Sequence, residues 1–553
     1  MSNPVTPGRA DDWRRRYDAF RPRGVELDPA KEPVEPYTAY PTTYAPGHLL
    51  LTDEGHEDAI RSNLDRAAGE FGWAVDIDRD PSDEVVAAGV ARRLARSQPR
   101  APIVRRVRIR PNPQPGRDDQ PVPPVDAWRL LQRMRALVLD PGEDVDTQAE
   151  TRDASPRVPV VKDPETLKGV GLDHVMSVGP FGHTNPFGHT NPFGHTNPFG
   201  HTNPFGHTNP FGPDSYARPG SGGRQVVDYV GPAPARREGE IPGRRPVVAF
   251  MDTGCWSGHD WFEGRMLEKP PTLGIVSADS DPEIKGDIAG PLDGFLDGAA
   301  GHGTFVAGVI LQACPDALLL PIRVADSMGT VLEGDFLDAV QDFLEALEGG
   351  LVVDALNISL GYYHETPADE QFDKTLSRLL VRIRELGCAV VCSAGNDSTS
   401  RPAFPASLWG WPDAEFHVED PKDAAPHVAV GALNPNGSVA LFSNVGRWVG
   451  TFTQGVSIVS TSPKFQGGMQ AGSRADRNGQ RREGLDPDDF ASGFAVWSGT
   501  SFAAPYIAGR LAAGIAEGLM DATTQTDAAS RSARLREVHD GLKDELDEGI
   551  MAP

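Results

Sequence analysis

The spacing of apolar residues predicts two structured regions separated by polar sequence. In the first, residues 47–165, period-two patterns indicate strands and a spacing of three to four indicates helices, such as Glu57 to Phe71 with Ile60 and Leu64 on one face. The order strand–helix–strand, then strand–helix, predicts a small α+β domain of ferredoxin-like type. The strands are predicted at 48–52, 73–78 and 103–110, and the helices at 57–71 and 125–138.

The second region, residues 245–520, alternates continuous apolar strands with helices. Because such strands are buried on both faces, we expect an α/β domain whose parallel sheet is covered by helices. Asp252 and Asn396 fall just past two of these strands, at the edge where active sites of such sheets gather. The strands are predicted at 245–251, 317–324, 353–360, 388–393, 427–431 and 456–460, and the helices at 302–313, 336–347, 372–386 and 502–519.

The remaining segments are rich in polar residues, glycine or proline. Residues 1–46 are predicted to form a polar tail, residues 166–244 a linker, and residues 462–497 a mobile surface loop. Residues 521–553 are predicted to be a solvated acidic tail with one helix at 533–547.

The predicted linker contains the sequence Pro-Phe-Gly-His-Thr-Asn five times in succession, from Pro180 to Asn209. Proline and glycine in every unit exclude a helix and a regular central strand. Three interpretations stay open: a flexible low-complexity linker, an internal substrate or occluding segment near the active site, and a metal-binding or pH-sensing tract. The last would use histidines whose six-residue spacing matches no recognised ligand pattern: His183, His189, His195, His201 and His207.

Composition narrows the class of protein. The 553 residues carry a formal net charge of −25, which argues against nucleic acid or an anionic membrane as a partner. The sequence contains no run of about 18 apolar residues, so no membrane span is expected. The polar N-terminus lacks the apolar core of a signal peptide, so none is expected. The four cysteines form no disulfide framework, so a reducing, cytoplasmic location is expected.

Four motifs carry candidate chemistry. Ser501, in Ser-Gly-Thr-Ser-Phe-Ala-Ala-Pro, opens an apolar helix whose N-terminal N–H groups favour developing negative charge. A serine hydroxyl needs a base to take its proton, and His302 in Gly-His-Gly-Thr is a candidate. Asp252 in Asp-Thr-Gly is a candidate carboxylate to orient that base, and Asn396 in Ser-Ala-Gly-Asn is a candidate oxyanion donor.

These motifs, in the order Asp, His, Asn, Ser, resemble those of the subtilisin-like serine proteases (subtilases) over roughly residues 245–520. The resemblance implies that Ser501 attacks a peptide carbonyl, that His302 shuttles the proton, and that Asp252 holds the imidazole. It also implies that Asn396, with the Ser501 backbone N–H, binds the oxyanion. The substrate would be a protein or peptide.

The resemblance extends to the substrate cleft. Ser359, Leu360 and Gly361 resemble the segment that pairs with an extended substrate by strand addition, although Tyr362 stands where a small residue is usual. Cys255, beside the Asp motif, is either a small buried residue or a redox control. No cofactor is expected. Members of the family often bind calcium, but no ligand cluster in the sequence is specific enough to assign it.

The N-terminal domain is open to two interpretations. Subtilases often carry such a domain as a folding aid and inhibitor, so one interpretation that the resemblance implies is intramolecular inhibition by this domain or by the repeat. The alternative is an unrelated accessory domain.

For the whole chain, a serine endopeptidase is the leading hypothesis. The alternatives are a latent or non-hydrolytic peptide-binding protein, and a self-processing protease cut within its own repeat.

Overall fold

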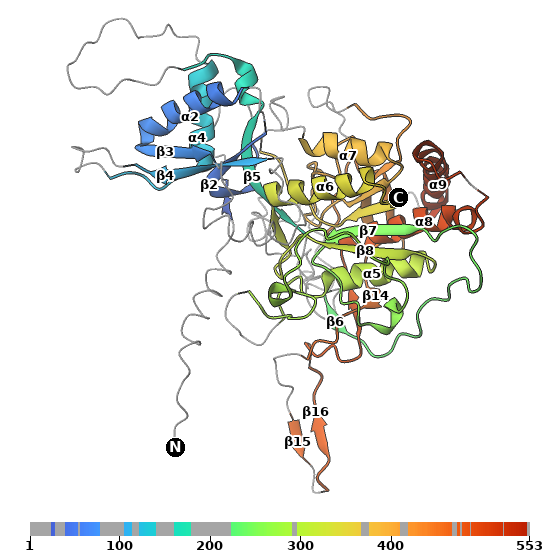
Figure 1. Ribbon diagram of the computed structural model, residues 1–553. Coiled ribbons are helices and arrows are strands. Elements are labelled where there is room, and N and C mark those ends of the chain that lie inside the picture. Colours follow the sequence, from blue (N-terminus) through green and yellow to red (C-terminus); the bar gives the residue numbers. More distant parts are fainter. Residues whose placement is uncertain are drawn as a thin grey trace, which may run out of the picture.

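The chain forms a smaller N-terminal α+β domain and a larger α/β domain (Figure 1). The computed structural model describes residues 24–27, 39–52, 56–77, 104–112, 121–139, 160–178, 223–289, 296–365, 375–409, 419–466, 473–475, 478–486, 488–523 and 525–549. The Pro-Phe-Gly-His-Thr-Asn repeat lies outside these residues, so its three interpretations stay predictions.

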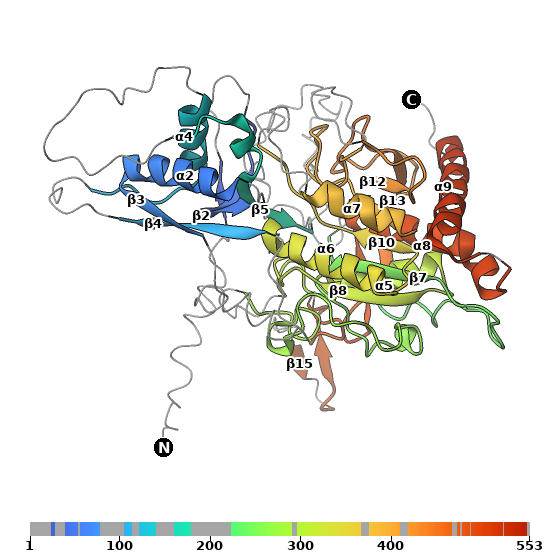
Figure 2. The same ribbon diagram turned by 45° about the horizontal axis from the view of Figure 1, so that its top comes forward.

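The N-terminal domain has the βαββαβ topology of the ferredoxin-like fold. Four of its antiparallel strands lie in the order β3-β4-β2-β5, with α2 and α4 on one face of the sheet (Figure 2). The apolar faces of both helices pack on that sheet, as the three-to-four-residue spacing requires. The elements are β1 (Val25–Glu26), β2 (Thr43–Leu51), α2 (Glu57–Phe71), β3 (Trp73–Ile77), β4 (Arg105–Pro111), α4 (Ala127–Leu139), the 3-10 helix η2 (Pro164–Leu167) and β5 (Val170–Ser177).

Two predicted boundaries of this domain are wrong. Residues 1–46 are not wholly a tail, because β1 pairs with the start of β2 and Leu27 is buried in the domain core. Residues 166–244 are not wholly a linker, because β5 is a central element of the fold. It pairs with β2 on one side and with β9 (Thr330–Leu332) of the larger domain on the other.

The α/β domain is built on a parallel sheet with the strand order β13-β12-β11-β10-β7-β8. Its strands are β7 (Val247–Asp252), β8 (Leu318–Arg323), β10 (Ala355–Ile358), β11 (Ala389–Ser393), β12 (His427–Leu433) and β13 (Thr451–Gln454). The predicted parallel sheet is therefore confirmed, except that one of its six predicted strands is replaced by another. Residues 456–460 were predicted as a strand of it, but the sixth strand is β13, and β14 (Ile458–Thr461) belongs to a small antiparallel sheet.

Helices cover both faces of the parallel sheet. Side chains of β7 alternate between two apolar clusters: Ala249 and Met251 join the cluster that contains α6 and α7, whereas Val248 and Phe250 join the one that contains α5 and α8. Figure 1 shows α6 and α7 on one side of β7 and β8 and α5 on the other. The helices are α5 (His302–Ala313), α6 (Glu333–Glu348), α7 (Thr375–Glu385), α8 (Thr500–Met520) and α9 (Ala528–Gly549), with 3-10 helices η4 (Asp260–Phe262) and η5 (Ala278–Ser280).

Two further predictions for this domain are wrong in part. Residues 462–497 are not simply a surface loop, since they contain the hairpin β15 (Ser473–Ala475) and β16 (Arg481–Glu483) and also β17 (Phe494–Trp497). β17 pairs with β14 and with β6 (Gln225–Val226). Residues 521–553 are not a solvated tail, because α9 packs on α8 and fully buries Leu535.

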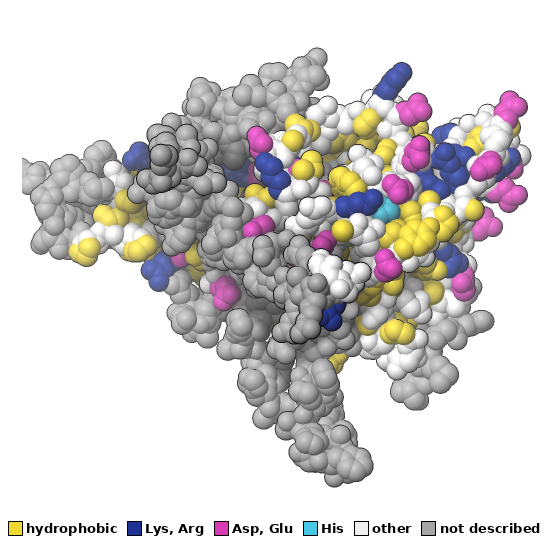
Figure 3. Space-filling view, turned by 90° about the horizontal axis from the view of Figure 1, so that it is seen from below, with side chains coloured by type: hydrophobic (Ala, Val, Ile, Leu, Met, Phe, Trp, Pro, Cys, Tyr) yellow, Lys and Arg dark blue, Asp and Glu magenta, His cyan; other side chains and the backbone are white. Residues whose placement is uncertain are grey.

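The surface carries mixed charge on the face shown in Figure 3, where acidic and basic side chains lie among one another. Of the helices in the described ranges, none combines the length and the apolar composition that crossing a bilayer requires.

Candidate functional site

The last residue of β7 and the first residue of α5 meet at the carboxyl end of the sheet. Nδ1 of His302 lies 2.7 Å from Oδ1 of Asp252, and both side chains are buried. That oxygen also accepts a 2.7 Å hydrogen bond from the backbone N–H of Thr253, which fixes the carboxylate. The rings of Trp497 and Phe502 flank the imidazole, with centroids at 5.5 and 5.0 Å. His302 is thus held in one orientation by a carboxylate and by aromatic packing.

Glycine allows these two elements to approach. Gly303 follows His302, and a Cβ on it would lie 2.0 Å from the main-chain oxygen of Gly254. Only a residue without a side chain permits this contact. Gly301 precedes the helix at φ 80°, a left-handed conformation that favours glycine. The Gly-His-Gly sequence therefore has a steric reason as well as a chemical one.

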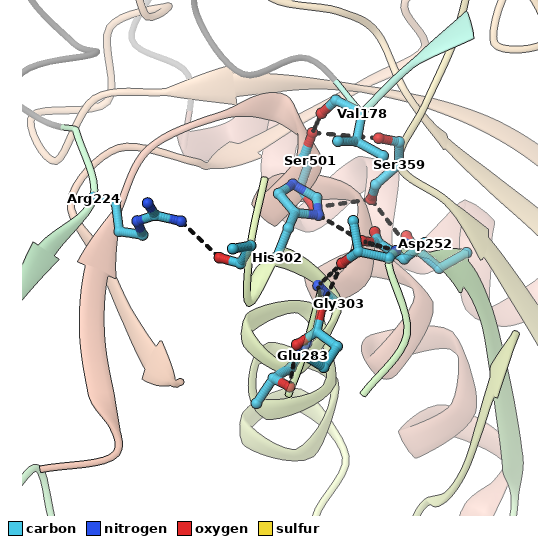
Figure 4. A network of polar contacts seen from close by, with 12 residues as sticks. Val178, Arg224, Asp252, Glu283, His302, Gly303, Ser359 and Ser501 are labelled. Atoms are coloured by element: carbon cyan, nitrogen blue, oxygen red, sulfur yellow. Dashed lines mark hydrogen bonds and ion pairs between the residues drawn. The ribbon is translucent and has the colours of Figure 1, made fainter. Parts of the chain in front are cut away.

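A buried carboxylate, Glu283, connects the two loops from below (Figure 4). Its oxygens accept hydrogen bonds from the hydroxyls of Thr253 and Thr304 and, at 3.2 Å, from the backbone N–H of Gly303. Burial raises the pKa of Glu283 to about 7 against the lowering effect of these threonines, with a further increase from the charge of Asp252. Glu283 thus couples the residue after Asp252 to the residues after His302.

Ser501 lies in the first turn of α8, with its side chain buried at the same end of the sheet. Its hydroxyl donates a 2.8 Å hydrogen bond to the main-chain oxygen of Val178 and lies 3.5 Å from the main-chain oxygen of Ser359. His302 lies between Ser501 and Asp252 (Figure 4). Three residues far apart in the sequence therefore converge, with the serine hydroxyl directed at a carbonyl of the same chain.

Asn396 follows β11 and faces the start of α8. Its Oδ1 accepts hydrogen bonds of 2.9 Å from both the backbone N–H and the hydroxyl of Thr500, the residue before Ser501. Because the oxygen takes these two hydrogen bonds, the N–H₂ group is the part of the amide that can donate. The sequence-predicted residue is therefore anchored next to the serine.

Ser359, Leu360 and Gly361 form the edge past the end of β10. Ser359 donates a 2.9 Å hydrogen bond to the main-chain oxygen of Ser501, and Leu360 is buried in the apolar core. Gly361 exchanges two backbone hydrogen bonds with Ser177, at 3.0 and 2.9 Å. The predicted strand-addition edge is thus occupied by β5, whose other side pairs with β9.

The arrangement has the parts that acyl transfer needs: a hydroxyl, an oriented imidazole, a buried carboxylate and an amide donor. Among the described residues, one group of at least three side chains brings potential metal-ligand atoms within 4.8 Å of one another, formed by His174, His364 and Glu365. It lies at the junction of the two domains and includes none of the predicted site residues. From the sequence no cofactor is expected and no calcium site is assigned, and this stays a prediction.

Several contributors were missed from the sequence. The strand β5 has a detectable signal, because Val170, Leu172, His174, Met176 and Val178 alternate with smaller or polar residues. Glu283 lies in an irregular polar segment with no periodicity, so only its three-dimensional contacts identify it.

Comparison with known proteins matches the α/β domain. The model of the subtilase family matches residues 243–532. A thermophilic serine proteinase of Bacillus sp. (strain AK1) is 27% identical over 262 residues, which are 47% of this chain and 50% of that protein. An intracellular serine protease of Paenibacillus polymyxa is 27% identical over 280 residues, 49% of this chain and 66% of that protein. This chain thus spans between half and two thirds of these relatives.

Two crystal structures are also similar. A lanthipeptide protease aligns with a TM-score of 0.37 and 22% identity over 54% of this chain and 79% of its own. A cold-adapted subtilisin-like serine proteinase aligns with a TM-score of 0.34 and 19% identity, over 55% of this chain and 85% of its own.

Proposed function

The chain belongs to the subtilase family, and on that premise we propose that it is a serine endopeptidase. Ser501 attacks the carbonyl carbon of a peptide bond while His302 takes its proton and then gives it to the leaving amine. Asp252 keeps Nδ1 of His302 protonated and stabilises the imidazolium. Asn396 and the Ser501 backbone N–H donate to the oxyanion. The 2.7 Å contact between His302 and Asp252, beside Ser501, is the observation that carries this proposal.

The substrate in this proposal is an extended protein or peptide segment. It binds as a strand between β9 and Gly361, because both edges offer backbone groups to β5 in the same antiparallel manner. The hydrogen bond from Ser501 to the carbonyl of Val178 supports this, since a substrate strand must deliver a carbonyl to that hydroxyl.

The test uses the full chain and its Ser501→Ala variant. A fluorophosphonate probe forms a covalent bond with an activated serine, so the wild type should be labelled and the variant should not. Hydrolysis of a denatured protein should likewise disappear in the variant. Equal labelling or equal hydrolysis by both proteins would reject the proposal.

The hydrogen bond between Ser501 and Val178 favours a second part of the proposal, in which the N-terminal domain inhibits the enzyme. β5 fills the strand-addition edge and Val178 engages the serine hydroxyl, so a second peptide cannot bind there at the same time. In this arrangement the intact chain is slowed rather than inactive, because a substrate or probe reaches Ser501 only in the molecules from which β5 has undocked. A purely non-hydrolytic binding protein would show the same occupancy but would never react with the fluorophosphonate, even after the N-terminal domain is released.

Self-processing is the remaining alternative, because Val178 contacts Ser501 and the repeat begins two residues later in the sequence, at Pro180. Comparing the intact mass of the wild type with that of Ser501→Ala tests it. A Ser501-dependent cut at the Val178–Gly179 bond or within residues 179–213 supports self-processing, whereas equal masses count against it.

We place the enzyme in a reducing compartment, the cytoplasm. All four cysteines are free, and burial raises the pKa of the Cys388 and Cys392 thiols, which keeps them protonated. Fractionation of cells that produce the chain tests this, and recovery outside the cytoplasm would contradict it.

A further inference from the structure

His174 of β5 lies between two carboxylates of the larger domain. Its Nδ1 is 2.6 Å from Oε2 of Glu333, and its Nε2 is 2.7 Å from Oε2 of Glu365. All three side chains are buried, with the imidazole 3% exposed. The ring of Tyr362 stacks on the imidazole at 4.7 Å, and the Tyr362 hydroxyl donates to the other oxygen of Glu333.

Two carboxylate oxygens, one on each ring nitrogen, favour a cation at this position. An ionised carboxylate only accepts hydrogen bonds, so each nitrogen of His174 must carry a proton. Burial by itself would lower the pKa of His174, but Glu333 and Glu365 outweigh it and raise that pKa to about 10. For Glu365, burial is outweighed by His364 and His174, which lower its pKa. The imidazolium therefore compensates buried negative charge.

The two carboxylates belong to the larger domain and stay there when β5 leaves. Glu333 is the first residue of α6, and Glu365 follows the edge that begins at Ser359. His364 and Arg401 of that domain and Arg135 of α4 also influence the charge of Glu365. A strand that replaces β5 would bind better if it brought a positive charge, because His174 supplies part of the compensation that these buried carboxylates need.

The strand continues past β5 to Val178, whose N–H donates to the main-chain oxygen of Gly329, so by strand alternation His174 and Val178 share a face, four residues apart. A peptide that takes the path of β5 thus presents its own side chain to the pocket four residues before the position of Val178. A guanidinium fits the pocket by chemistry, since its planar fork can donate to both carboxylates, and an ammonium can do so as a point charge.

We propose that Glu333, Glu365 and Tyr362 form a cation-accepting subsite of the peptide-binding cleft, which His174 fills in the intact chain. The substrates are peptide segments that carry Arg or Lys four residues before the position of Val178. This inference rests on the proposed endopeptidase activity.

A metal ion is the competing occupant, because His174, His364 and Glu365 offer three ligand atoms within 4.8 Å of one another. Two ligands of a tetrahedral zinc ion lie about 3.3 Å apart, given bonds of 2.0–2.2 Å. Nε2 of His174 and Oε2 of Glu365 are 2.7 Å apart, which suits a shared proton and leaves no room for the ion between them.

The test digests a mixture of unstructured peptides with the full chain and identifies the cut sites by mass spectrometry. Ser501-dependent cuts should be enriched about tenfold in Arg and Lys at one fixed upstream position. Glu333→Gln and Glu365→Gln should remove the enrichment, whereas Glu348→Gln, on the exposed end of α6, should keep it. Ser501-dependent cuts without a basic preference would overturn the subsite and leave the endopeptidase standing.

Absence of any Ser501-dependent cut would reject the endopeptidase and the subsite with it. Zinc or another divalent metal bound in a 1:1 ratio, lost on His174→Ala, would overturn the subsite in favour of a metal centre.

A second measurement tests the proposal even if the glutamine variants do not fold. In full-chain Ser501→Ala, hydrogen–deuterium exchange of the β9 amides reports whether β5 is docked. His174→Arg should keep their protection, and His174→Glu should raise their exchange by about tenfold or more. Equal protection in both variants would overturn the proposal, because the pocket would then not discriminate charge.

Discussion

The hydroxyl of Ser501 donates a 2.8 Å hydrogen bond to the main-chain oxygen of Val178, a residue 323 positions earlier in the chain. This contact joins the two domains at the point where the chemistry is proposed to occur. It depends on β5, which pairs with β2 of its own domain and with β9 of the other. The proposed inhibition and the proposed substrate binding would therefore use the same edge, and changes at the domain junction should alter activity without touching the serine.

Arg106 offers the first test of that junction. This residue of β4 pairs at 3.1 Å with Asp173 of β5 and, also at 3.1 Å, with Asp335 of α6 in the larger domain. Arg106→Ala should weaken docking by about 1–3 kcal/mol, because it leaves the buried Asp173 with less compensation. The rate of peptide hydrolysis by the intact chain should therefore rise. Arg110→Ala is the matched control, since Arg110 lies on the same strand and pairs with Asp76 of β3, within its own domain. Equal rates in the two variants would contradict inhibition by docking.

Asn396 should affect turnover more than substrate binding. Asn396→Ala removes the proposed donor to the oxyanion and should lower kcat by about 10²–10³-fold with little change in KM, the loss that a single oxyanion donor causes in proteases of this family. Steady-state kinetics on a fluorogenic peptide measure both constants. Asn434→Ala, in the turn after β12, serves as the control. A change confined to KM would remove Asn396 from the oxyanion role.

Gly303 should tolerate no side chain. The Cβ of an alanine would lie 2.0 Å from the main-chain oxygen of Gly254, so α5 must move away from the loop after Asp252. The contact between His302 and Asp252 would lengthen, and fluorophosphonate labelling should fall more than about tenfold, with a loss of about 1–3 kcal/mol in stability. Gly541→Ala is the control, because that glycine of α9 has nothing within 4 Å of its added Cβ. Normal labelling of Gly303→Ala would show that the close approach is dispensable.

The sequence predicted the parallel sheet and the four motifs because both depend on local pattern. Continuous apolar strands can be recognised without knowing their partners, and Asp252 and Asn396 mark the ends of two of them. The ferredoxin-like domain was likewise recognised from five of its six elements. The roles of the motif residues came from a resemblance, and their geometry came only with the structure.

What the sequence missed depends on contacts between distant segments. The alternation from Val170 to Val178 indicates a strand, but nothing in it shows that this strand ends at Ser501. Glu283 and His174 are isolated polar residues whose buried partners lie 20 to 191 positions away. Burial of such groups follows from tertiary structure and cannot be inferred from composition.

Glu283 predicts a pH dependence of stability. Its pKa rises from 4.5 to about 7 on folding, mainly through burial, so the folded state holds a proton that the unfolded state has lost between these values. The contribution is complete below pH 4.5 and is lost as the pH rises to about 7, a difference of roughly 3 kcal/mol. Glu283→Gln should therefore match the parent near pH 4.5 and exceed it in stability at pH 8.

Chemical denaturation of Ser501→Ala, with and without Glu283→Gln, at several pH values measures this difference. Glu348→Gln, an exposed carboxylate of α6, controls for the change in net charge. A stability difference between Glu283→Gln and its parent that does not vary with pH would contradict the raised pKa.

The C-terminal helix provides the last prediction, because the sequence suggested a solvated tail and the structure places an apolar face of α9 on α8. Leu535 is fully buried, and a Cβ on Gly514 of α8 would lie 2.5 Å from Cγ1 of Val538. The two helices therefore touch where glycine removes the side chain. Leu535→Ala should lower stability by about 2–5 kcal/mol through the cavity it creates. Glu537→Ala, on the exposed side of α9, should change it by less than about 0.5 kcal/mol. If both substitutions are equally silent in denaturant unfolding, α9 does not stabilise the domain; if only Leu535→Ala is costly, the helix is part of the α/β core.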